Sequence, residues 1–178
     1  MKALIVYGSK YSSTKVISEW IAERLNFDTV IKDAKDAPSP GDFDLVLLGS
    51  AIYEGSFMPE VSSYIDRYMD TLEEKKKVIF GVCLDTEGVF VKGKVHGGWK
   101  YIMPIIKKFK NPPLHAGLLH GEINPSKLSS EDNKRLMHFY NKILSKNYSA
   151  IPYRTKMNKE EVWEFAERII NKLEGKIY

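Results

Sequence analysis

The hydrophobic positions follow two patterns along the chain: short unbroken apolar runs, and apolar residues spaced three or four positions apart. Unbroken runs are typical of strands buried on both faces of a sheet, and the wider spacing is typical of helices with one buried side. The runs predict strands at residues 2–7, 27–31, 44–49, 77–84 and 114–119. The spaced positions predict helices at residues 14–25, 59–72, 99–109, 129–144 and 158–173. Ser129, followed three residues later by Asp132, is typical of the cap that opens the fourth of these helices.

Strands and helices therefore alternate, which indicates a parallel sheet covered by helices on both faces. The 178 residues suit one domain spanning residues 1–178, because no repeat or long linker divides them. Residues 37–42 are rich in Pro and Gly, so we expect a loop or single turn between the second and third strands. Pro104 should kink its helix or mark the true start, and residues 148–157 should be irregular.

Composition narrows the class of protein. Hydrophobic residues at 43% and charged residues at 28% are typical of a globular domain. The single cysteine excludes an internal disulfide framework and favours a reducing compartment. No apolar run approaches the ~20 residues of a membrane span, and the N-terminus lacks a signal-peptide pattern. We therefore expect a soluble, cytoplasmic protein.

Charge is unevenly distributed along the chain. Residues 1–85 carry a net charge of −4 and residues 86–178 carry +8, which together give the overall +4. A basic half can face an anionic substrate, a protein partner or a membrane surface. Alternatively, Lys107, Lys108 and Lys110 are simply the solvated side of a helix. No nucleic-acid-binding module accompanies the basic half, so we expect no nucleic-acid partner.

The strongest chemical signal is the loop at residues 8–14, which places several hydroxyl groups and backbone amides directly before a helix. The amino end of a helix has unpaired N–H groups and favours anions, so this loop is a candidate phosphate site. The alternative is that Ser12 or Ser13 merely caps the helix. Neither the P-loop pattern nor the Gly-rich dinucleotide pattern is present, and a short hydroxyl loop suits a phosphate monoester.

Two further loops follow the third and fourth predicted strands and should open on the same edge of the sheet. In the first, Gly49 and Gly55 would let the backbone approach a flat ring, and Tyr53 and Phe57 would wall it in, unless Tyr53 only packs over the strand end. The second loop, residues 85–98, is longer than a usual connection. The neighbouring Trp99 and Tyr101 would close over a ligand or belong to the core.

Other reactive side chains form weaker patterns. Cys83, near Asp85 and His96, could act as a thiol nucleophile, but its place at the end of an apolar strand favours a buried hydrophobic role. The four histidines show no spacing typical of metal ligands, so we expect no metal site.

The segment from Tyr7 to Thr14 resembles the FMN-phosphate loop of flavodoxins, with Ser9 and Thr14 matching and Ser12 in place of the usual glycine. Residues 49–55 resemble one branch of that family, the proteins similar to menaquinone-dependent protoporphyrinogen IX dehydrogenase. That branch also has extra sequence between the last strand and last helix, here about residues 121–157. The resemblance implies an α/β flavodoxin-like three-layer sandwich with a five-stranded parallel sheet in order 2-1-3-4-5 and this insertion.

The resemblance also implies FMN as the cofactor, bound at the sheet edge. The residues implied for the phosphate are Ser9, Lys10, Tyr11, Ser12, Ser13 and Thr14. The residues implied for the isoalloxazine are Ser50, Ala51, Ile52, Tyr53, Glu54, Gly55, Leu84, Asp85 and Thr86. The flavin performs the redox chemistry, so no catalytic acid or base is assigned.

Three functional classes follow from the resemblance. The favoured one is an FMN-dependent oxidoreductase that oxidises protoporphyrinogen IX with a quinone acceptor, with Lys92, Lys94 and Lys100 placed to meet the porphyrinogen carboxylates. The helix at residues 136–144 would approach a membrane quinone by peripheral contact, or else pack in the core. The alternatives are an electron-transfer flavodoxin serving protein redox partners, which is typically acidic, and an interaction module without FMN.

Overall fold

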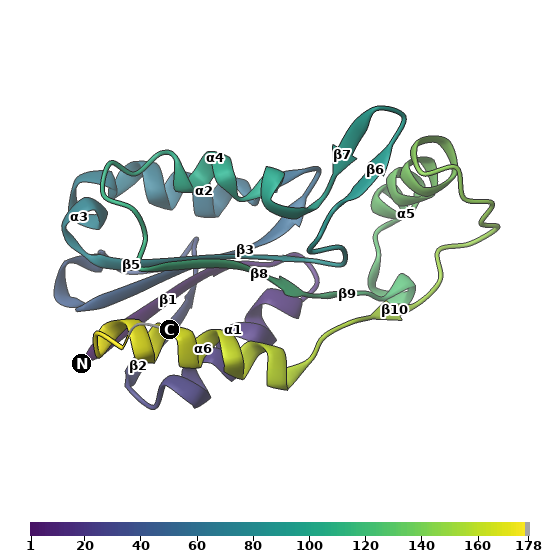
Figure 1. Ribbon diagram of the computed structural model, residues 1–178. Coiled ribbons are helices and arrows are strands. Elements are labelled where there is room, and N and C mark those ends of the chain that lie inside the picture. The colour runs from purple at the N-terminus through teal and green to yellow at the C-terminus, as the bar shows by residue number, and fades with distance from the viewer. Residues whose placement is uncertain (177–178) are drawn as a thin grey trace.

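The computed structural model describes residues 1–176 and shows a central parallel sheet between two layers of helices (Figure 1). Neighbouring strands follow the order β2-β1-β3-β5-β8, which confirms the predicted order 2-1-3-4-5. The strands are β1 (Lys2–Gly8), β2 (Asp28–Asp33), β3 (Leu45–Tyr53), β5 (Lys76–Cys83) and β8 (His115–His120). A short strand, β4 (Ser56–Phe57), pairs antiparallel with the end of β3.

Helices cover both faces of the sheet, as the alternating pattern predicts (Figure 1). One face carries α1 (Ser13–Leu25) and α6 (Lys159–Leu173), and the other carries α2 (Pro59–Arg67), α3 (Met69–Glu74) and α4 (Met103–Ile106). Among residues 1–176, no helix has the length and apolar character that crossing a bilayer demands.

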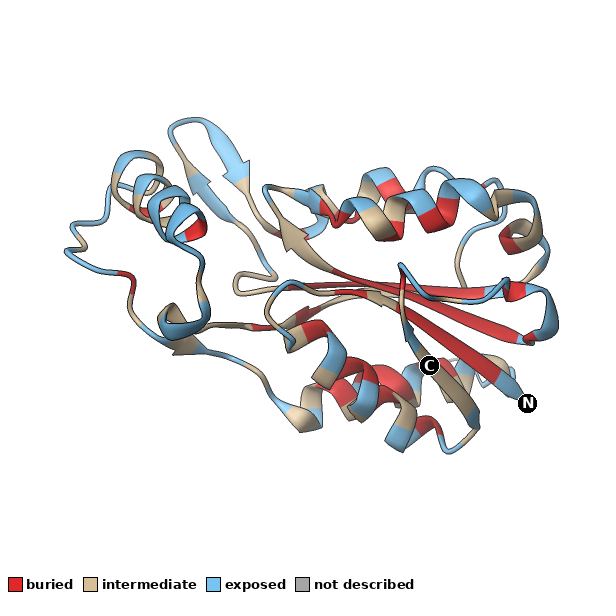
Figure 2. Ribbon diagram, turned by 180° about the vertical axis from the view of Figure 1, so that it is seen from behind, coloured by how far each residue is buried: buried red, intermediate tan, exposed pale blue. Residues whose placement is uncertain are grey.

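The sheet is buried on both sides, so each strand contributes to two apolar cores (Figure 2). Along β1, Leu4 and Val6 pack under α2 and α4, whereas Ala3 and Ile5 pack under α1 and α6. Successive side chains of a strand point to opposite faces, which explains why these strands are continuous apolar runs in the sequence.

Two predicted helices are shorter than expected. The helix predicted at residues 59–72 is divided at Tyr68 into α2 and α3, because the backbone leaves the helical region there, with φ −113° and ψ 23°. The helix predicted at residues 99–109 is a 3₁₀ turn, Gly98–Tyr101, followed by α4. Pro104 lies in the first turn of α4, so it marks a helix start, where a missing N–H costs nothing.

The long loop after β5 contains a hairpin, β6 (Val89–Val91) paired with β7 (Lys94–His96). Its two-residue turn, Lys92 and Gly93, has positive φ at both positions, 50° and 77°. Positive φ at both central residues is the pattern of the tight turn that joins twisted antiparallel strands. The predicted loop at residues 85–98 thus contains a hairpin that the sequence reasoning did not predict.

The insertion between β8 and α6 lies beyond the carboxyl end of the sheet (Figure 1). It contains a short antiparallel pair, β9 (Glu122–Ile123) and β10 (Arg154–Thr155), and α5 (Ser130–His138), which continues as a π-helical turn, Phe139–Ile143. The Ser129 side chain accepts a hydrogen bond from the Asp132 N–H at 3.1 Å, which confirms the predicted helix cap. Residues 148–157 are irregular except for β10.

Candidate functional site

A cavity of about 650 Å³ opens at the edge of the sheet where β1, β3 and β5 end. Its volume is in the range of small-molecule sites. The cavity lies beside the neighbouring strands β1 and β3, where the strand order reverses, and ligands of open α/β sheets bind at such a point. The structure brings most of the predicted site residues together there. Those that line the cavity are Ser9, Lys10, Tyr11, Ser13, Ala51, Ile52, Tyr53, Glu54, Gly55, Leu84 and Asp85.

Four predicted residues, Ser12, Thr14, Ser50 and Thr86, lie outside the lining. The Ser50 hydroxyl is buried, accepts a hydrogen bond from the Met58 N–H at 2.7 Å and donates one to the Ala51 carbonyl at 2.8 Å. Ser50 therefore fixes the turn that leads into α2. Thr86 makes a hydrogen bond to the His120 ring at 3.1 Å, away from the cavity.

The loop before α1 has unused hydrogen-bonding capacity. Ser12 adopts the left-handed conformation, with φ 75°, and its side chain makes no capping hydrogen bond within residues 1–176, so Ser12 is not a helix cap in the usual sense. The Thr14 hydroxyl is fully buried and has no hydrogen-bond partner in the described part of the chain. An unpaired buried hydroxyl is costly, and this one lies in the first turn of a helix that favours anions. The loop therefore fits a phosphate group.

A buried carboxylate joins the insertion to the two loops of the core. Asp132 of α5 is 4% exposed, and Lys10 Nζ lies 2.7 Å from its Oδ2. The hydroxyl groups of Tyr11 and Tyr53 both donate hydrogen bonds to the same carboxylate. Burial alone raises the pKa of Asp132, but the hydrogen bonds from these three side chains outweigh burial and lower the pKa to about 2. The hydrogen bond to Asp132 in turn raises the pKa of Lys10.

The outer wall of the cavity comes from the hairpin and the insertion. The sequence reasoning expected the loop at residues 85–98 at this edge of the sheet, but it named no residue of the insertion as a cofactor ligand. The helix stripe at residues 136–144 faces this cavity, with Leu136, Phe139, Tyr140 and Leu144 in the wall. Lys92 at the hairpin tip donates a hydrogen bond to the Lys142 carbonyl at 2.9 Å, so hairpin and insertion meet. The residues contributed by these outer segments are Val89, His96, Gly97, Tyr101, Gly121, Glu122, Ile123, Asn124, Leu128, Asp132, Arg135, Leu136, Phe139, Tyr140 and Leu144.

Some predicted neighbours of the ligand have other roles. A side chain at Gly49 would collide with the buried Phe80 ring, 2.0 Å away, so this glycine is explained by core packing and not by a ligand. Phe57 is 4% exposed and belongs to the core. Tyr101 lines the cavity and lies against Gly55, whereas Trp99 is 49% exposed and lies outside the lining.

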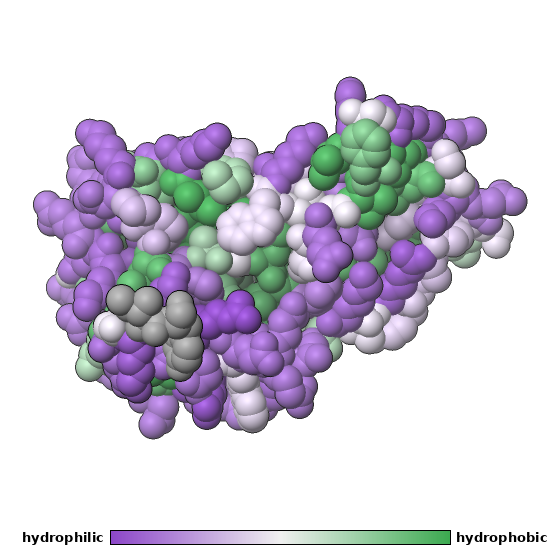
Figure 3. All heavy atoms as spheres, in the orientation of Figure 1, coloured by the Kyte–Doolittle hydropathy of each residue, from purple (hydrophilic) through white to green (hydrophobic). Residues whose placement is uncertain are grey.

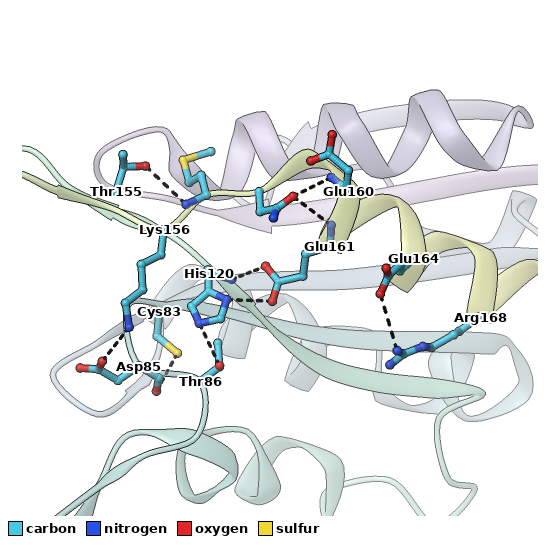
Figure 4. A network of polar contacts seen from close by, with 12 residues as sticks. Cys83, Asp85, Thr86, His120, Thr155, Lys156, Glu160, Glu161, Glu164 and Arg168 are labelled. Atoms are coloured by element: carbon cyan, nitrogen blue, oxygen red, sulfur yellow. Dashed lines mark hydrogen bonds and ion pairs between the residues drawn. The ribbon is translucent and has the colours of Figure 1, made fainter.

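A polar network anchors residues 84–86 beneath the cavity (Figure 4). Glu161 of α6 accepts a hydrogen bond from the His120 backbone N–H at 3.2 Å, and its carboxylate lies 2.8 Å from Nδ1 of the His120 ring. The other ring nitrogen forms a hydrogen bond with the Thr86 hydroxyl. Burial raises the pKa of the nearby Cys83 thiol to about 11, which favours its hydrophobic role over that of a nucleophile. No cluster of three or more metal-ligating side chains occurs within residues 1–176.

The sequence is similar to known proteins over much of its length. The flavodoxin domain family matches residues 4–150. An uncharacterized protein of Methanocaldococcus jannaschii is 35% identical over 81 residues, which are 45% of this chain and 53% of that protein. The aligned region thus spans about half the length of this curated relative.

Solved structures share the fold at low sequence identity. Oxidised flavodoxin 1 of Bacillus cereus has a TM-score of 0.56 at 14% identity, covering 96% of this chain and 98% of that chain. A flavodoxin from the Archaea has a TM-score of 0.56 at 16% identity, covering 98% and 99%. Rubredoxin oxygen:oxidoreductase of Desulfovibrio gigas has a TM-score of 0.59 at 16% identity, covering 98% of this chain but 36% of that chain. These structures share the α/β flavodoxin-like fold, and the match over residues 4–150 shows that this chain belongs to the flavodoxin domain family.

Proposed function

We propose that this protein is an FMN-dependent oxidoreductase whose substrate is a small molecule bound in the cavity beside the flavin. Membership of the flavodoxin domain family supports a flavin-dependent redox role. When bound, FMN supplies the electron-transfer chemistry, and the protein supplies binding, orientation and exclusion of water. The observation that carries the proposal is the outer wall of the cavity, which the hairpin and the insertion build largely from apolar side chains.

One group of residues would bind the phosphate of FMN, and another would contact its ring. The hydroxyl groups of Ser9, Ser13 and Thr14 and the amides at the start of α1 would hold the phosphate. Tyr53 and residues 84–85 would flank the flavin ring. This donor set is neutral, because the ammonium group of Lys10 is already paired with Asp132.

The outer wall favours a substrate enzyme over an electron carrier. A carrier needs an exposed flavin edge that a protein partner can reach, whereas here Leu128, Leu136 and Phe139 of the insertion line the cavity. Apolar walls with a few polar groups are typical of sites for small organic molecules. A porphyrinogen as donor and a quinone as acceptor are the proposed pair, because both carry extensive apolar surface that suits such walls. Each pair of hydrogens lost by the porphyrinogen would then reduce one quinone to a quinol.

The hairpin supports a membrane route for such an acceptor. Phe90 and Val95 face each other across the two strands and are 73% and 44% exposed. Figure 3 shows apolar residues gathered over the hairpin and α5. Lys92 and Lys94 lie at the turn, and lysines beside exposed apolar side chains favour an anionic lipid surface. Phe90→Ser should lower turnover with a quinone embedded in anionic vesicles and leave turnover with a short water-soluble quinone unchanged.

The function is tested on the purified protein reconstituted with FMN. We expect a visible flavin spectrum, oxidation of a porphyrinogen under anaerobic conditions and re-oxidation of the reduced protein by a quinone. Ser9→Ala combined with Thr14→Ala should weaken FMN retention, and Ser39→Ala, in a distant exposed turn, is the matched control.

Each alternative has its own outcome in this experiment. Reaction with redox proteins but with neither small molecule would assign the chain to the electron carriers. Failure to bind FMN supplied in excess would leave an interaction module and would overturn the proposal.

A further inference from the structure

Asp132 makes contacts that its own helix does not require. The cap of α5 uses the Ser129 side chain and the Asp132 backbone N–H, so the Asp132 carboxylate is left for other partners. Those partners, Tyr11 and Tyr53, are 121 and 79 residues away in the sequence. Charge-assisted hydrogen bonds to a buried carboxylate are strong, and a buried charge with fixed partners restricts their positions.

The contacts restrict Tyr53 in particular. Its hydroxyl donates a hydrogen bond to Asp132 and accepts one from Lys10 at 3.1 Å. Lys10 Nζ also lies 4.7 Å from the centre of the Tyr53 ring, over one of its faces. With its hydroxyl held by Asp132 and Lys10, the Tyr53 ring that lines the cavity has a set orientation.

We propose that Asp132 is a positioning residue for the flavin ring, acting through Tyr53, and that it thereby makes the insertion part of the cofactor site. The inference rests on the proposed binding of FMN. Riboflavin lacks the phosphate, so its affinity reports the contact with the ring alone. In FMN, loss of the Asp132 charge also leaves the Lys10 ammonium group unpaired near the phosphate, which offsets part of the loss.

The test measures dissociation constants of the full-length apoprotein for FMN and for riboflavin by flavin fluorescence. Asp132→Asn keeps the shape of the side chain and removes its charge. We expect the affinity for riboflavin to fall by about tenfold, the usual size of a lost charged hydrogen bond, and the affinity for FMN to fall less. Flavin fluorescence should be quenched less in the bound state, because Tyr53 no longer holds its orientation. Glu131→Gln is the matched control: the neighbouring side chain is 73% exposed, and both affinities should stay unchanged.

A second variant keeps the test decisive if Asp132→Asn does not fold. Tyr53→Phe removes only the hydroxyl group that Asp132 holds, and it should weaken both flavins to the same degree. If Asp132→Asn folds, adding Tyr53→Phe to it should cause little further loss, because the two residues act together.

The outcomes separate this inference from the proposed function. An unchanged affinity for riboflavin would overturn the role assigned to Asp132, because any change confined to FMN places the effect at the phosphate. If the wild-type protein binds neither flavin, the proposed function itself fails. If the wild-type protein binds flavin normally and the Asp132→Asn protein binds riboflavin equally well, only the role assigned to Asp132 fails.

Discussion

At the scale of single residues, the backbone conformation of Ser12 in the loop before α1 is unfavourable. Ser12 has φ 75°, a left-handed conformation that costs a non-glycine residue roughly 1 kcal/mol or more. In the flavodoxin pattern that this loop resembles, the position is glycine, which adopts a positive φ without this cost.

Replacing Ser12 by glycine should therefore stabilise the protein by about 1 kcal/mol. The melting temperature should rise by about 2–4 °C, the shift expected for that free energy at this chain length. Ser13→Gly is the control, because Ser13 begins α1 and glycine weakens helices. A Ser12→Gly protein that melts at or below the wild-type temperature would show that the left-handed conformation carries no strain.

His115 makes stability depend on pH. Burial, with help from Lys172 and Arg168, lowers its pKa from 6.5 to about 4. As pH falls from about 6.5 to about 4, the unfolded chain takes up the proton first, so the free energy of unfolding falls by about 3 kcal/mol at most. His115→Phe should keep the packing against Phe165 and flatten this part of the profile. Equal slopes for the two proteins in chemical denaturation would contradict the assignment.

At the scale of elements, the hairpin and the insertion close the cavity while the sheet holds the cofactor loops. The hairpin supplies Val89 and His96 to the wall, and the His96 ring lies edge-on to Phe139 of the insertion at 5.9 Å. The two segments thus support each other across the opening.

Replacing residues 89–96 by a short Gly-Ser linker should open the cavity without unfolding the sheet. Iodide should then quench bound FMN more strongly than in the wild type, because the ring gains access to water. Phe90→Ser is the control, because that side chain points away from the wall and is 73% exposed. Equal quenching in all three proteins would mean that the hairpin does not shield the flavin.

The sequence predicts the sheet better than it predicts the outer wall. Leu4, Ile5 and their neighbours form runs whose only stable place is a strand buried on both faces. The hairpin was missed because its strands have only three residues and because Lys92-Gly93 is not one of the dipeptides typical of a two-residue hairpin turn. Asp132 was recognised only at a helix cap, because its partners in the loops are far away in the sequence and no local pattern reports such a contact.

At the scale of the whole molecule, two cores on either side of one sheet support a cofactor site at the edge. The charge asymmetry is less informative than it first appears from the sequence. Lys107, Lys108 and Lys110 are all exposed, and Lys108 pairs with Asp66 at 2.6 Å, which favours the interpretation as a solvated surface.

Binding of FMN should stabilise the entire fold, because the ligand binds only the native state. With free FMN at 100 times its dissociation constant, the stabilisation is about 2.7 kcal/mol. The melting temperature should therefore rise by about 5–10 °C in differential scanning calorimetry. At the same FMN concentration, the variant with Ser9→Ala and Thr14→Ala should gain less, and an equal gain would place the phosphate elsewhere.

The hydrogen bond from Lys92 to the Lys142 carbonyl joins the hairpin to the insertion, and this arrangement bears on how new activities can be engineered in this protein. The two segments begin at the carboxyl ends of β5 and β8 and lead into α4 and α6, so replacing them leaves the pairing of the five parallel strands intact. In the proposed function, the segments that would hold the cofactor and those that would meet the acceptor are therefore different parts of the chain. A library of variants changed only in the hairpin and the insertion could be screened for new reactions while the sheet and the loops proposed to bind FMN stay unchanged.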